Sequence, residues 1–168
     1  MSGSILFLVH LIGFGIVFTV ILAGWILNRR FTHEEDPRTR LYVGGLMRTI
    51  GLLSPLAAAI LLISGIGNIF HRYPDAMSRW FTEGWLVAKL IVFVVFLING
   101  IIYGPRLARR RMALAKDITD GNSPKGAETD FALLNNQISL FYVVQIVLLL
   151  FILTLSVFGT SKHVGFFG

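Results

Sequence analysis

Four apolar stretches of the chain are each long enough to cross the hydrocarbon layer of a membrane, and this feature limits the fold more than any other. A transmembrane helix needs about 20 residues, at about 1.5 Å of rise each. The stretches cover residues 4–27, 42–70, 85–104 and 138–158. A chain of 168 residues with 55% hydrophobic and 14% charged residues also has too much apolar surface for one small soluble core. The sequence therefore predicts an integral membrane protein whose main partner is the lipid bilayer.

The first apolar stretch differs from a secretory signal peptide. No basic residue precedes it, and it ends at Asn28-Arg29-Arg30 rather than at a small-residue cleavage site. We expect it to remain in the mature protein as the first transmembrane helix.

The basic residues between the stretches predict the orientation. The first and third loops hold ten of them: Arg29, Arg30, Arg38, Arg40, Arg106, Arg109, Arg110, Arg111, Lys116 and Lys125. The second loop and the C-terminal tail hold three: Arg72, Arg79 and Lys162. Cytoplasmic loops carry the excess of lysine and arginine. We therefore expect a multi-pass protein of the inner (plasma) membrane of a bacterium, with both termini on the non-cytoplasmic side.

The connections between the stretches favour antiparallel neighbours, so the predicted fold is all-α, an up-down-up-down four-helix bundle. Residues 1–168 are expected to form a single transmembrane domain, with a flexible cytoplasmic loop over residues 117–130. Pro55 is expected to kink the second helix, because proline removes a backbone hydrogen bond. Asn99 and Gln145 are expected to hydrogen-bond across the bundle.

The composition excludes several kinds of site. The chain has no cysteine, which rules out disulfides, iron–sulfur clusters and thiolate metal sites. Its net charge of +6 fits a basic rim at the membrane surface, and no nucleic-acid motif accompanies that charge. We therefore expect no nucleic-acid partner.

Three ionisable residues lie inside the predicted spans, namely His10, Arg48 and Lys89. Each such residue costs on the order of 2.5 to 3.5 kcal/mol on insertion scales, so each needs a partner or a function. His10 and Lys89 are both displaced about 9 Å from the membrane midplane, toward the non-cytoplasmic side. Arg48 lies about one and a half turns from the cytoplasmic end of the second span, where an arginine can reach the interface. His10 and Lys89 thus share one depth, and Arg48 lies apart from them.

One cofactor would satisfy both residues at the shared depth. A neutral imidazole is a common haem ligand, and a lysine amine either ligates iron or pairs with a haem propionate. The alternative is structural: His10 bonds a neighbouring helix, and Lys89 extends to the interface. His71, at the end of the second span, is either a second ligand or an exposed loop histidine.

The residues around this pair resemble a known family. Leu8-Val9-His10-Leu11-Ile12-Gly13 and Gly84-Trp85-Leu86-Val87-Ala88-Lys89-Leu90 are similar to motifs of the HemJ-type protoporphyrinogen oxidases and of the wider group with CopD-like domains. Pro55 looks like the proline that breaks the second helix in these proteins, and Arg48 like a basic residue that precedes it. The resemblance covers about the first 115 residues. Gly24-Trp25-Ile26-Leu27-Asn28-Arg29 stands where HemJ-type oxidases have Arg-Leu-Phe-Val-Tyr-His, and a fifth hydrophobic segment is missing.

The resemblance implies a membrane four-helix core that binds haem b. Its cofactor- and metal-binding residues would be His10 and Lys89, and its candidate catalytic residues Lys89 and Arg48. The leading interpretation is a haem-b-binding membrane protein with a redox role, and if it is an enzyme, it is a haem-dependent membrane oxidoreductase. Its partner would be a porphyrin or an electron-transfer protein. One alternative is a non-catalytic accessory subunit of a larger respiratory or photosynthetic membrane complex, or a homo-oligomer. Copper handling, as in CopD-like proteins, has less support, since the chain has only four methionines and no cluster of soft-metal ligands.

Overall fold

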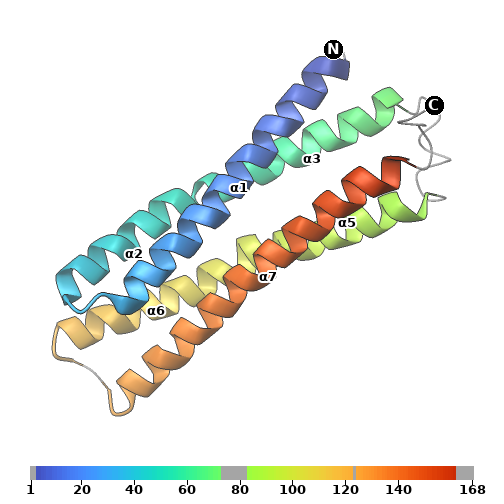
Figure 1. Cartoon of the computed structure of the whole chain (residues 1–168). Helices are drawn as coiled ribbons and strands as arrows, with labels where there is room; N and C mark the ends of the chain where they lie inside the picture. Colours follow the sequence, from blue (N-terminus) through green and yellow to red (C-terminus); the bar gives the residue numbers. More distant parts are fainter. Residues whose placement is uncertain (1–2, 73–82, 123, 162–168) are drawn as a thin grey trace.

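The structure is a computed structural model that describes residues 3–72, 83–122 and 124–161 (Figure 1). Within these ranges, four helical segments are long and apolar enough to cross a membrane. The first and fourth are the single helices α1 (Gly3–His33) and α7 (Ala127–Ser161). The second consists of α2 (Pro37–Gly51) and α3 (Leu53–Arg72). The third consists of α5 (Gly84–Leu97), the π-helix η1 (Ile98–Tyr103) and α6 (Gly104–Thr119). The predicted all-α membrane bundle is confirmed.

The helices form two antiparallel pairs that lie side by side (Figure 1). One pair is α1 with α2 and α3, and the other is α7 with α5 and α6. We call the end where α1 begins and α7 ends the termini end. The opposite end, where α1 ends and α7 begins, is the loop end. Each helical segment extends beyond the predicted span at the loop end.

The centre of the bundle is apolar. Its buried side chains come from four helices and are Val17, Ile21, Ala57, Leu61, Phe96 and Leu149. A second buried cluster of Phe31, Val43 and Ala115 lies at the loop end. Many large apolar residues face outward, among them Phe7, Ile63, Ile91 and Leu150. An outward apolar surface of this kind suits lipid as the surrounding solvent.

The second helical segment is interrupted at Leu52, three residues before Pro55. Proline has no N–H, so the carbonyl of Gly51 four residues earlier loses its helical partner. The chain tightens there, because the Leu52 N–H donates to the carbonyls of both Arg48 and Thr49 at 3.2 Å. The structure thus places the expected irregularity at the turn that precedes the proline.

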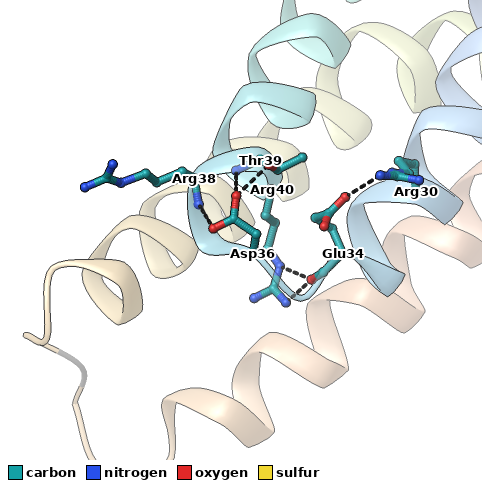
Figure 2. A network of polar contacts seen from close by, with 6 residues as sticks. All are labelled: Arg30, Glu34, Asp36, Arg38, Thr39 and Arg40. Atoms are coloured by element: carbon teal, nitrogen blue, oxygen red, sulfur yellow. Dashed lines mark hydrogen bonds and ion pairs between the residues drawn. The ribbon is translucent and has the colours of Figure 1, made fainter.

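The first loop is short and held by polar contacts (Figure 2). Asp36 caps α2, because its carboxylate accepts hydrogen bonds from the backbone N–H of Thr39 at 2.9 Å and of Arg38 at 3.4 Å. Arg30 forms an ion pair at 2.9 Å with Glu34, the first residue after the end of α1. The guanidinium of Arg40 donates to the backbone carbonyl of Glu34. These contacts fix the connection between α1 and α2.

The third loop is shorter than the flexible region expected over residues 117–130. Helix α6 continues to Thr119 and α7 begins at Ala127. Gly121 and Gly126 have φ values of +73° and +86°, which favour glycine. Gly121 ends α6 in a Schellman-type turn, in which the Asn122 N–H donates to the Asp117 carbonyl at 2.9 Å.

Candidate functional site

His10 lies on α1 and faces α3. Its Nδ1 is 2.9 Å from the hydroxyl oxygen of Ser64, a residue that is 1% exposed. Gly65 leaves room for the ring, since a Cβ atom at that position would lie 3.3 Å from the His10 Cε1. The imidazole is therefore positioned by two consecutive residues of the neighbouring helix.

The hydrogen bonds of Ser64 indicate the tautomer of His10. The Ser64 hydroxyl donates to the backbone carbonyl of Ile60 at 2.5 Å. A hydroxyl has one proton, so toward His10 this oxygen can only accept. The ring also bonds the backbone of Leu61, so two polar groups of α3 face the imidazole. We infer that Nδ1 carries the imidazole proton, and Nε2 has no hydrogen bond to a described side chain. A histidine that binds a metal has this arrangement, because the bond at one ring nitrogen orients the other.

Lys89 lies on α5, in the opposite helix pair, and is half-buried. Its amine is close enough to His10 for the two groups to interact electrostatically. The amine forms no hydrogen bond or ion pair with any residue that the structure describes. The two residues that the sequence places at one depth therefore lie within electrostatic range of each other, and no hydrogen bond joins these two described residues.

Packing is looser around this pair than in the centre of the bundle. Gly13, Ser64 and Leu149 are the last buried residues of their helices toward the termini end. Beyond them, Leu86 is the one buried residue among those the structure describes. His10 and Lys89 thus lie at the edge of the core, where neighbouring side chains are half-buried or exposed.

The donor chemistry of the pair fits a haem. An imidazole lone pair suits an axial position on iron, and an unpaired amine suits either the other axial position or a propionate. Among the described residues, no group of three or more His, Cys, Asp or Glu side chains gathers as metal ligands. Two nitrogen donors beside apolar side chains suit a porphyrin, which supplies four nitrogen ligands itself, better than a bare metal ion.

Arg48 lies apart from the pair. It is exposed near the end of α2, about 24 Å along the helix axis from the level of Ser64. The structure therefore does not join Arg48 and Lys89 in one catalytic site, and we assign Arg48 no role at His10.

His71 is also separate from His10. It is exposed, and its ring packs against Gly3, where an added Cβ atom would lie 2.2 Å from the ring. Gly3 is seven residues from His10, about 10 Å along α1. His71 therefore lies exposed at the end of α3, away from His10.

The loop end holds a buried arginine, Arg111, although its position in the sequence predicts a basic residue of the third loop. Arg111 on α6 is 2% exposed. Its Nη1 donates to the side-chain oxygens of Asn28 at 2.6 Å and Asn135 at 3.2 Å. The guanidinium carbon lies 4.0 Å from the centre of the Phe31 ring, and Nη2 is 3.5 Å from the Met47 sulfur. One side chain thus ties α6 to α1, α2 and α7.

The acceptors around Arg111 are connected to one another. The Asn28 amide donates to the Ser139 hydroxyl at 3.2 Å, and that hydroxyl donates to the Asn135 backbone carbonyl at 2.9 Å. The one ion pair among the described residues is Arg30 with Glu34, so neutral groups surround the buried guanidinium. Spacing was the signal that could have identified Arg111: with Leu107 and Ala115 it forms a row at intervals of four residues on the buried face of α6.

Comparisons with known proteins add no relatives, since no family model, curated protein or solved structure matches the chain. The fold and the site therefore define its class. It is a multi-pass α-helical membrane protein with an imidazole and an amine within electrostatic range of each other at the edge of its core.

Proposed function

We propose that the protein binds haem b between its two helix pairs and has a redox role in the membrane. His10 would hold the haem iron through Nε2, and the Lys89 amine would bind the iron or pair with a propionate. The single observation that carries this proposal is the Ser64–His10 hydrogen bond, which orients the imidazole through Nδ1. When bound, haem b supplies one-electron redox chemistry.

The residues of the chain would have separate tasks. Ser64 orients the imidazole and keeps the proton on Nδ1. Lys89 offsets the negative charge of the propionates or supplies a neutral amine as a ligand. Gly65 keeps the ring close to α3. The resemblance to HemJ-type oxidases supports a porphyrin or an electron-transfer protein as the partner.

The proposed location is the inner membrane of a bacterium, with the termini end facing away from the cytoplasm. The excess of arginine and lysine at the loop end supports this orientation. The three basic residues counted on the opposite side include Arg79 and Lys162, which lie outside the described residues. The haem would then lie in the half of the membrane farther from the cytoplasm.

A visible absorption spectrum tests the haem proposal. The protein purified in detergent from cells supplied with haem should show a Soret band and contain iron. The His10→Ala variant should lose the band, whereas Arg48→Gln should keep it, because Arg48 lies far from the pair. A colourless, iron-free wild-type protein would refute the proposal.

One observation favours the second candidate, an accessory subunit of a larger membrane complex or a homo-oligomer. An open groove on the third helical segment is lined by Val95, Ile98, Asn99 and Tyr103. The Asn99 side-chain nitrogen is buried there without a hydrogen-bond partner among the described residues. A polar group on a second helix would satisfy it. Purification in a mild detergent distinguishes the candidates: an accessory subunit returns only in a large assembly, whereas a free-standing haem protein returns alone.

A further inference from the structure

Two irregular helical segments border the same cavity inside the bundle. The second segment is broken at Leu52, and the third contains the π-helix Ile98–Tyr103. The cavity has a volume of about 30 Å³, and Ser54, just after the break, and Gly100, within the π-helix, both line it. In membranes, irregular backbone occurs where it is buried in protein or lines a water-filled cavity. Because both irregular segments border this one cavity, we ask whether it holds water.

The same cavity contains a buried polar atom without a partner. Gln145 on α7 is 4% exposed, and it lines the cavity beside Ser54 and Gly100. Its side-chain oxygen has no hydrogen bond to any residue that the structure describes. The expected hydrogen bond across the bundle is thus absent from the described part of the chain. An unpaired amide oxygen is unfavourable in an apolar interior, so the site lacks one donor.

The amide of Gln145 has little freedom to move toward another partner. Its nitrogen packs against Gly100, where an added Cβ atom would lie 2.6 Å away. The remaining walls are mainly apolar and include Val17, Ile21 and Phe96. The other polar side chain that lines the cavity is Ser54, whose hydroxyl forms no hydrogen bond with any described residue.

We propose that this cavity is a binding site for water within the membrane-spanning bundle. A water molecule there donates one hydrogen bond to the Gln145 side-chain oxygen and forms a second with the Ser54 hydroxyl. A cavity needs about 10–15 Å³ of this kind of volume to hold one water, and the water needs at least two polar partners. The observed cavity meets both conditions, and it is too small for any cofactor.

The bound water suits the irregular backbone of both helical segments at this depth. Around Pro55, the second segment has a freed carbonyl and an unpaired serine hydroxyl. The π-helix brings Gly100, which has no side chain, against the Gln145 amide. One water molecule allows the second, third and fourth segments to pack together at this cavity, where no direct hydrogen bond joins their described side chains.

The experiment is NMR on the full chain in lipid nanodiscs, with ¹⁵N introduced only in glutamine. The chain has two glutamines, the buried Gln145 and the exposed Gln137, so the second is an internal control. The Gln145→Leu variant assigns the signals by removing one pair. We expect a direct Overhauser cross-peak between the Gln145 amide protons and a long-lived water, and slow hydrogen exchange at that amide. Gln137 should show only fast exchange with bulk water.

Two outcomes would overturn the proposal. One is a resolved Gln145 amide signal with cross-peaks to neighbouring methyl groups and none to water, which would indicate a dry cavity. The other is exchange as fast as that of Gln137, which would indicate an opening to bulk water. The Ser54→Ala variant adds a further check, since loss of the second polar partner should reduce the water cross-peak at least several-fold. The wild-type measurement needs no variant to fold.

Discussion

The two ends of the bundle hold their buried basic side chains differently. At the loop end, Arg111 is 2% exposed and its guanidinium contacts side chains of three other helices. At the termini end, Lys89 is half-buried and its amine has no hydrogen bond to a described residue. Asn28 and Asn135 accept from Arg111, and each is held in turn by other groups. His10 has Ser64 as its one side-chain partner among the described residues. A polar network whose groups all bond to one another, like that of Arg111, stabilises the fold without a ligand. Polar groups that lack such partners, like the Lys89 amine, remain available to bind one.

Replacing Arg111 gives the largest expected effect. Arg111→Ala leaves the oxygens of Asn28 and Asn135 buried without a donor and removes the contact with Phe31. We expect the free energy of unfolding to fall by about 3 kcal/mol. Unfolding by denaturant in detergent, followed by circular dichroism, measures this change. The neighbouring Arg110 is exposed, so Arg110→Ala should change stability by less than about 0.5 kcal/mol. Equal stability of the two variants would contradict a structural role for the network.

Replacing Ser64 tests the open end of the comparison. Ser64→Ala removes the group that orients His10, so haem affinity should fall about 10- to 100-fold. A haem titration monitored at the Soret band measures the affinity. Thr154 is the matched control, because its hydroxyl only donates to the Leu150 carbonyl on an exposed face. If Ser64→Ala and Thr154→Ala bind haem with the affinity of the wild type, the serine does not set the tautomer of the ligand.

Much of the fold could be predicted from the sequence because lipid imposes simple requirements. Each apolar stretch must be helical, since only a helix satisfies its own backbone in the bilayer. The missing N–H of Pro55 made an irregularity in the second segment predictable. The π-helix could not be predicted, because its six residues have no pattern that distinguishes it from an α-helix. Its presence depends on the packing of Gly100 against Gln145, which is a tertiary contact.

The candidate site was predictable only in part. Helical rise places His10 and Lys89 at one depth, but which helix faces His10 depends on how the bundle is assembled. Ser64 was therefore not identified, since its role comes from lying opposite the imidazole. Arg111 was missed for another reason. Three consecutive arginines were counted as loop charge, although the helical row through Leu107 and Ala115 places the third on the buried face.

A pair of glycines in α1 compares tight and open packing on one helix. The Tyr142 hydroxyl lies over Gly24, where an added Cβ atom would be 2.7 Å from the phenol oxygen. Nothing lies within 4 Å of the corresponding position at Gly15. Gly24→Ala should therefore destabilise the protein by about 1–2 kcal/mol, because the core has no room for the methyl group. Gly15→Ala should leave stability unchanged or raise it by up to about 1 kcal/mol. Thermal unfolding of both variants in one detergent tests the difference, and destabilisation by Gly15→Ala alone would contradict it.

The smallest expected effect comes from the first loop, where Asp36 caps α2 (Figure 2). Hydrogen bonds from the Thr39 hydroxyl and the Thr39 backbone N–H hold the pKa of Asp36 below its ordinary value of 3.8. A carboxylate with a lowered pKa in the folded state stabilises the fold above its unfolded pKa. That contribution is lost as the pH falls through the folded pKa.

The wild type should thus lose a small part of its stability below about pH 4. Asparagine still caps a helix and does not titrate, so Asp36→Asn should remove this part of the pH dependence. Thermal midpoints of both proteins from pH 7 to pH 3 measure it. If the thermal midpoints of the two proteins change with pH in the same way, the charge of the Asp36 carboxylate adds nothing to the stability of the cap.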